Sequence, residues 1–152
     1  MERYGTHCEQ TYRTNFNRSR AKCINWIKFN LALSRRYLNM DGLLAIAIDP
    51  SYICKSGKKT PHIGTFWSGC ASSMKHGLEI MGLALVDVYA NNCMMLRAHQ
   101  TPSTSELKLR SMTLVQHYIA VIKRYRKDLL AVSDIIVADA FFSIRPFVDG
   151  IK

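Results

Sequence analysis

Apolar residues recur along the chain with two different spacings, which predict a helical first part and a strand-rich second part. Between residues 24 and 38 they lie three or four positions apart, as on one face of an amphipathic helix. Thr6-x-x-Glu9 has the pattern of a capping box, in which both side chains satisfy free backbone N–H groups, and it predicts an earlier helix start. Asp41-Gly42 predicts a turn that ends this helical portion.

Shorter apolar runs follow the turn and predict strands. The run 43–48 is continuously apolar, which suits a strand that is covered on both faces. Two further strands are predicted at 78–88 and 93–99, and the asparagine-containing stretch between them suits a hairpin turn. Residues 50–77 are rich in glycine, serine, lysine and proline, and they predict a loop with little regular structure.

The last third of the chain predicts a helix, a strand and a second helix. Ser103-x-x-Glu106 is another capping box, and the periodic stretch behind it predicts one helix that ends near Lys127. The segment "DIIVA" (134–138) predicts a short strand, and Ser143 predicts the cap of a last helix. The order β-β-β-α-β-α, with a helix between the third and fourth strands, predicts an α/β fold with a mixed sheet.

The charge of the chain limits the classes of partner that we expect it to bind. A net charge of +10 favours a polyanion, which could be DNA, RNA or an anionic membrane surface. No apolar run approaches the roughly 18 residues that cross a bilayer, and no stretch has the pattern of a signal peptide. The five cysteines are scattered without C-x-x-C spacing. We therefore expect reduced thiols, a cytoplasmic location and no membrane partner.

Two carboxylates give the strands a candidate chemistry. Asp49 follows the first predicted strand and Asp139 follows the fourth. If these strands are neighbours, both carboxylates emerge at one edge of the sheet, and their mutual repulsion is relieved by a divalent cation such as Mg²⁺ or Mn²⁺. The alternative is structural: Asp49 before a proline initiates a turn, and Asp139 caps the following helix.

Basic and aromatic residues near these aspartates allow two interpretations each. Lys55, Lys58 and Lys59 either contact phosphates without reading sequence or form a solvated turn. Phe66 and Trp67 either pack in the protein or stack on bases. Of two other carboxylates near the second predicted strand, Glu79 is expected at the surface, and Asp87 is a minor candidate for the metal site.

The segments around both aspartates resemble DDE transposases of bacterial insertion sequences. The resemblance is carried by "AIDPSYICKSGKKTPHIGTFWSGCASSMKHGLEIMGLALVDV" (47–88) and "IIVADAFFSIRPFV" (135–148). In that family an aspartate on the first strand precedes a Lys-Ser/Ala-Gly-Lys-Lys turn, and a second aspartate follows the fourth strand in a Val-Ala-Asp-aromatic context. The stretch "RYGTHCEQTYRTNF" (3–16) is similar to the helical lead-in of such proteins.

The resemblance implies a fold, a reaction and partners. It implies a ribonuclease H-like fold, with a helical portion at 1–41 that is a candidate for DNA contact and a catalytic domain from residue 42 onward. Asp49 and Asp139 match the first two acidic ligands of two Mg²⁺ or Mn²⁺ ions. The implied reaction is metal-dependent cleavage of transposon ends and strand transfer into target DNA. A homo-oligomer in the bacterial cytoplasm, associated with the nucleoid and without a small-molecule cofactor, is also implied.

One part of the family pattern is missing. The third acidic ligand, a glutamate on a later helix, has no counterpart, because Asp149 lies too close to Asp139 in the chain to match it. The chain is therefore interpreted as a truncated transposase whose segment 42–152 is the first part of the catalytic domain. The alternatives are a catalytically inactive DNA-binding or regulatory fragment and a nuclease of the same fold.

Overall fold

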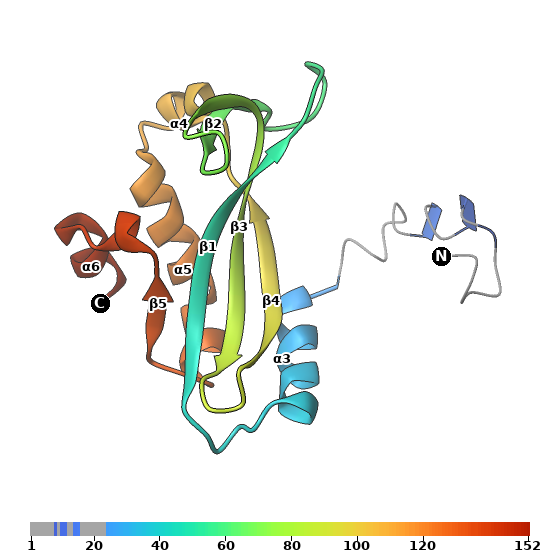
Figure 1. The fold of residues 1–152 in the computed structure, drawn as a ribbon, viewed down its shortest axis with the longest axis vertical. Coiled ribbons are helices and arrows are strands. Elements are labelled where there is room, and N and C mark those ends of the chain that lie inside the picture. Colours follow the sequence, from blue (N-terminus) through green and yellow to red (C-terminus); the bar gives the residue numbers. More distant parts are fainter. Residues whose placement is uncertain (1–7, 9, 12–13, 16–23) are drawn as a thin grey trace.

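A computed structural model describes residues 8, 10, 11, 14, 15 and 24–152 of the chain. The described part is an α/β protein with a mixed sheet of five strands and four α-helices (Figure 1). In chain order the elements are α3 (Trp26–Tyr37), β1 (Leu44–Cys54), β2 (Gly64–Ser68), β3 (Ser73–Asp87), β4 (Asn92–Gln100), α4 (Thr104–Leu109), α5 (Leu114–Leu130), β5 (Ile136–Ala138), the 3₁₀ helix η1 (Ala140–Phe142) and α6 (Arg145–Ile151). The predicted capping box at Thr6 and Glu9 lies outside the described residues.

Strand β3 lies at the centre of the sheet. It pairs antiparallel with β1 along one edge and with β4 along the other. Gly77 of β3 pairs with both Cys54 of β1 and Gly64 of β2, so β2 lies on the same edge as β4, further along the sheet. Strand β5 pairs in parallel with the outer side of β1, from Ile46↔Ile136 to Ile48↔Ala138. The chain thus forms an antiparallel group of strands and returns through α4 and α5 to a parallel edge strand.

The hydrophobic core joins the sheet to helices. Met81, Leu83 and Leu85 alternate along β3 and are completely buried. They belong to one apolar cluster with the inner side of α5, including Tyr118 and Ile122. Among the described residues, no helix is both long enough and apolar enough to cross a membrane.

Helix α3 confirms the helix expected before the first strand. The Asn25 side chain caps it by accepting a hydrogen bond from the backbone N–H of Lys28 (3.3 Å). Asn30 then donates to the backbone oxygen of Leu96 (2.9 Å), which fixes α3 beside β4 (Figure 1). The chain turns at Asp41 before it enters β1, as predicted.

Three of the predictions about helices, strands and loops are wrong. The stretch 50–77 is not an irregular loop, because it contains the end of β1, all of β2 and the beginning of β3. The single helix expected after Ser103 is two helices, α4 and α5. The chain turns between them at Ser111, whose φ is 51°, and Thr113 with Gln116 forms a second capping box that starts α5. At the end of the chain, Ser143 ends η1 and does not cap α6.

His117 is buried where α5 meets β4. Its side chain is 7% exposed, its ring centre lies 5.9 Å from that of His99, and its Nε2 has no hydrogen-bond partner among the described residues. Burial, and to a smaller extent the nearby charges of His99, Arg110 and His62, together lower the pKa of His117 to about 4. His117 is therefore neutral in the folded protein at neutral pH.

We expect acid to destabilise the fold through His117. An unfolded histidine has a pKa near 6.5, so as pH falls from about 6.5 toward 4 the unfolded chain takes up a proton that the folded chain refuses. Stability is complete above this window and is lost as pH falls through it. Urea unfolding at pH 7.5 and pH 5.0 should show a smaller acid loss for His117→Gln than for the parent. The exposed His76→Gln is the control, and an unchanged pH dependence in His117→Gln would contradict this assignment.

Candidate functional site

Asp49 lies in the middle of β1. The first strand was predicted to end at Ile48, but its pairing with β3 continues as far as Cys54. Asp49 therefore has paired residues both before and after it in the β1–β3 ladder. Its side chain is exposed, and its Oδ2 accepts a hydrogen bond from Ser51 Oγ (2.8 Å). The second oxygen, Oδ1, has no hydrogen bond from the described residues.

Pro50 is compatible with this extended strand. The N–H of Ile46 donates to the backbone oxygen of Ile135 (2.8 Å), so the even-numbered residues of β1 direct their backbone nitrogens toward β5. The ladder with β5 ends at Ile48. At position 50 this side of β1 is an edge, so the missing N–H of proline removes no ladder hydrogen bond.

Asp139 follows β5 directly. The side chain accepts a hydrogen bond from the N–H of Phe141 (3.1 Å), which makes Asp139 the N-cap of η1, and its Oδ2 has no hydrogen bond from the described residues. The cap role was one of the two interpretations made from the sequence. It uses only one carboxylate oxygen, so it does not prevent the second role.

The strand register brings the two aspartates to neighbouring positions. Ile48 and Ala138 form the last parallel pair of β1 and β5, and Asp49 and Asp139 are the next residue of each strand. Adjacent strands lie about 4.8 Å apart, so the two backbones are close at this point. Each aspartate is exposed and keeps one oxygen without a hydrogen bond. Two such oxygens suit Mg²⁺ or Mn²⁺, which binds through one or two carboxylates and completes its shell with water and phosphate oxygens.

The other candidate carboxylates are engaged elsewhere. Asp87 is 1% exposed and accepts hydrogen bonds from the N–H groups of Asn39 (3.1 Å) and Ala90 (3.0 Å), so it anchors two turns at the far end of β3. Asp149 lies on α6, where its oxygens contact Arg145 and Lys152, each at 3.3 Å. Within residues 24–152 and the described positions before them, no group of three or more metal-binding side chains is present.

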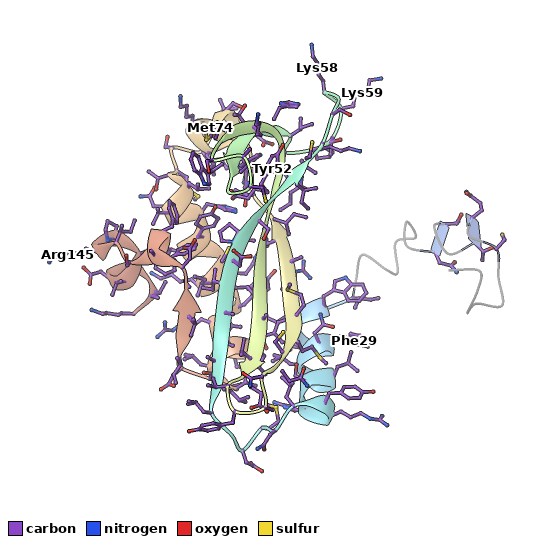
Figure 2. The ribbon with its side chains drawn as sticks, in the orientation of Figure 1. Phe29, Tyr52, Lys58, Lys59, Met74 and Arg145 are labelled. Atoms are coloured by element: carbon purple, nitrogen blue, oxygen red, sulfur yellow. The ribbon has the colours of Figure 1, made fainter. Side chains whose placement is uncertain are left out.

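The lysine loop lies beyond the far end of β1, where Figure 2 shows Lys58 and Lys59. Lys55, Lys58 and Lys59 are exposed in the loop after Cys54. From Asp49 to Cys54 the strand advances five residues, or about 17 Å at 3.3 Å per residue. The lysines therefore do not share a phosphate with the aspartates. At 3.4 Å per base pair, the loop begins about five base pairs along a duplex that follows β1.

This loop is fixed to the sheet at its base. Tyr52 Oη donates a hydrogen bond to the backbone oxygen of His76 (2.7 Å), and Nε2 of His76 contacts the backbone oxygen of Gly57 (3.2 Å). Gly57 has a φ of 95°, a conformation that favours glycine. The position of the positive charges is thus set by contacts with β3 and does not depend on the loop alone.

A buried carboxylate that the sequence analysis missed lies on the other face of the sheet. Glu79 was expected at the surface, but it is 7% exposed and accepts a hydrogen bond from the Tyr118 hydroxyl. Burial and this hydrogen bond raise the pKa of Tyr118 well above its usual value. The sequence contains a signal for this position. Side chains alternate between the two faces of a strand, so Glu79 lies on the same face of β3 as the buried residues Met81, Leu83 and Leu85.

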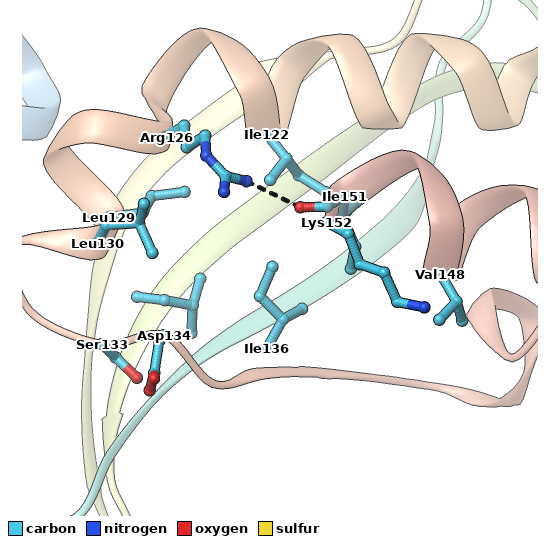
Figure 3. Close-up of a pocket in the computed structure, with 11 residues that line it drawn as sticks. Ile122, Arg126, Leu129, Leu130, Ser133, Asp134, Ile136, Val148, Ile151 and Lys152 are labelled. Atoms are coloured by element: carbon cyan, nitrogen blue, oxygen red, sulfur yellow. Dashed lines mark hydrogen bonds between the residues drawn. The ribbon is translucent and has the colours of Figure 1, made fainter.

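Glu79 and Tyr118 line a pocket of about 440 Å³ that extends to Asp139. Pro50, Trp67 and Phe141 also contribute to its wall. A second cavity of about 380 Å³ lies at the other end of β5, between α5 and α6 (Figure 3). This second cavity is largely apolar, and Arg126 crosses it to donate a hydrogen bond to the backbone oxygen of Ile151 (2.9 Å). Of these two cavities, only the first has one of the two aspartates, Asp139, in its lining.

Comparisons with known proteins do not assign the chain to a family. No family model matches the sequence, and no curated protein or solved structure matches it. The site is therefore characterised by its geometry: two exposed aspartates in register on parallel strands, a basic loop further along the sheet, and an aromatic pocket that Asp139 lines.

Proposed function

We propose that this chain carries part of the active site of a DDE-type DNA transposase with a ribonuclease H-like catalytic domain. The observation that supports this most is the register of β1 and β5, in which Asp49 and Asp139 are consecutive to the last paired residues. The strand order also agrees with the expected topology: β1, β3 and β4 are antiparallel, and β5 returns through α5 to lie parallel to β1. The resemblance of the two aspartate segments to insertion-sequence transposases points in the same direction.

In this proposal Asp49 and Asp139 hold the metal. Asp49 is positioned by the continuous ladder of β1, and Asp139 by the end of β5 and by its bond to Phe141 N–H. A bound Mg²⁺ or Mn²⁺ ion supplies activation of a water or 3′-hydroxyl and stabilisation of the leaving oxygen of a phosphodiester. The aspartates themselves fix where that chemistry occurs, and the net charge of +10 attracts the DNA.

A second candidate function is DNA binding without catalysis, in a regulatory fragment. It is favoured by the engagement of Asp87 and Asp149 in other contacts, which leaves two aspartates where the family uses three acidic ligands. A complete site for two ions needs that third group. A nuclease of the same fold outside transposition would share the aspartate pair.

An assay with supercoiled plasmid separates the candidates. If the chain is catalytic, incubation with Mn²⁺ should convert supercoiled to nicked DNA, and EDTA should prevent this. If it only binds, the plasmid should be retarded in a gel in a salt-sensitive manner and remain supercoiled. Absence of both nicking and binding would contradict the proposal. Transfer of a labelled DNA end into the plasmid would distinguish a transposase from a simple nuclease.

We expect the lysine loop to contribute charge and no sequence reading. Each phosphate contact adds about 0.9 to the slope of log K against log salt on duplex DNA, so the double substitution Lys58→Ala/Lys59→Ala should reduce the slope by about 2. Affinity should fall equally for different sequences. The control is Lys123→Ala/Lys127→Ala, which removes the same charge from α5, and an equal loss of slope in both variants would contradict a specific role of the loop.

A further inference from the structure

The pocket beside Asp139 has two exposed aromatic walls. Trp67 on β2 is 58% exposed and Phe141 on η1 is 48% exposed, and both line the pocket. Phe141 is held in place by edge contacts with Phe142 and Tyr118, whose ring centres lie 5.1 and 6.4 Å away. Phe66, the neighbour of Trp67, is buried. The sequence allowed Phe66 and Trp67 either to pack in the protein or to stack on bases. Of these two residues, only Trp67 is accessible to a ligand.

The inner wall of the same pocket carries a carboxylate, Glu79, with one oxygen that can still accept a hydrogen bond. Glu79 is more than nine-tenths buried, and one of its oxygens accepts from the Tyr118 hydroxyl. The other oxygen has no hydrogen-bond partner among the described residues. This oxygen is not among the fully buried side-chain atoms that lack a partner, so it is accessible from the pocket that Glu79 lines and can accept a hydrogen bond from a ligand N–H. The size of the pocket, about 440 Å³, is within the roughly 300–1,000 Å³ of ordinary ligand pockets.

We propose that this pocket receives one unpaired nucleobase that carries an exocyclic amino group, next to the phosphodiester bound at Asp49 and Asp139. Stacking on Trp67 and Phe141 binds the flat face of the base, and Glu79 accepts a hydrogen bond from its amino group. This inference rests on the proposed DNA function, because the DNA backbone at Asp139 delivers the base to the pocket. Adenine and cytosine both have the required amino group, and thymine lacks it.

A basic side chain of a partner protein would also suit aromatic walls and a carboxylate. Two observations favour the base. Asp139 belongs both to this pocket and to the pair of aspartates, so the pocket adjoins the place where the DNA backbone is proposed to lie. The chain itself carries a net charge of +10, which attracts nucleic acid and repels a basic peptide.

Tryptophan fluorescence of the full chain tests this directly. The chain has two tryptophans, so Trp26→Phe leaves Trp67 as the only reporter. In buffer with EDTA, single-stranded eight-nucleotide dA and dC oligomers should quench Trp67 and bind about tenfold more tightly than the dT oligomer. A filter-binding assay does not depend on tryptophan fluorescence. In that assay, Trp67→Ala should weaken binding of the dC oligomer by about tenfold, because stacking on one aromatic residue is removed. The control is Phe29→Ala, which removes an aromatic residue of similar exposure from α3.

Glu79→Gln tests the amino-group preference. Glutamine keeps the size of the side chain but replaces one acceptor oxygen by a donor, so we expect the dC-over-dT preference to disappear while a thermal melt shows that the variant is folded. Equal binding of dC and dT by the parent would overturn the proposal, as would an unchanged affinity in Trp67→Ala. Quenching by an arginine-rich peptide but not by any oligomer would assign the pocket to a protein partner. Because no metal is used, nicking without base binding would refute only this pocket, and base binding without nicking would refute only the catalytic proposal.

Discussion

Asp49→Asn should abolish Mn²⁺-dependent nicking, with a loss of at least about a hundredfold if the parent is active, because charge stabilisation at the reacting oxygens is usually the largest catalytic contribution. Asparagine keeps the shape of the side chain and its bond with Ser51, but it removes the negative charge that the metal requires. Calorimetric titration with Mn²⁺ gives a second readout that does not need catalysis. We expect weak binding by the parent and none by Asp49→Asn or Asp139→Asn.

The matched control is Asp134→Asn. Asp134 is also exposed and close to β5, but it precedes the strand, whereas Asp139 follows it. Its substitution changes net charge by the same amount and should leave Mn²⁺ binding and nicking unchanged. Equal loss in Asp134→Asn and Asp49→Asn would mean that total charge, and no defined site, governs the reaction.

Gly77→Ala should cause the largest loss of stability among the glycine substitutions we considered. A Cβ at position 77 would lie 2.7 Å from Cε2 of Tyr52 and closer still to the backbone oxygen of Ile53. Tyr52 can rotate, but the carbonyl belongs to the β1–β3 ladder and cannot move without breaking it. Overpacking of this kind costs about 2 kcal/mol, which lowers Tm by roughly 5 °C for a chain of this size.

Gly69→Ala is the control for this prediction. Nothing lies within 4 Å of a Cβ at position 69, and no positive φ is involved, so its Tm should stay close to that of the parent. Displacement of Tyr52 would also release its bond to the backbone of His76, so Gly77→Ala should loosen the lysine loop and weaken DNA binding. A Tm equal to that of Gly69→Ala would show that β1 accommodates the methyl group.

Much of the sheet could be predicted from local patterns, because the apolar runs before Asp49 and Asp139 and the hairpin between β3 and β4 are strong signals. The stretch 50–77 could not. The start of β3 is polar and exposed, and β2 has only five residues, with exposed positions on either side of the buried Phe66. These strands form because β3 pairs with both β2 and β1, which is a tertiary effect. The break between α4 and α5 was predictable in principle from Thr113-x-x-Gln116, but the apolar period runs across it and conceals it.

The candidate site could be predicted in part. Two aspartates after apolar runs were visible in the sequence, and their register follows from the parallel pairing of β1 with the short strand β5. The distance from the aspartates to the lysine loop could not be predicted, because it depends on the extension of β1 past Pro50. Glu79 was assigned to the surface on residue type, although its position places it on the same face of β3 as Met81 and Leu83; only its contact with Tyr118 required knowledge that this face meets α5.

Strand β5 holds Asp139 through only three residue pairs, with Ser133 Oγ bonded to the backbone oxygen of Leu44 (2.7 Å) at its beginning. So short an edge strand can separate from the sheet while the β1–β3–β4 core remains folded, and local openings of this kind cost far less than global unfolding. An ion that binds only when both aspartates are in place would stabilise the closed form by mass action. In this protein, ordering of the sheet margin and occupancy by metal would then be two aspects of a single equilibrium.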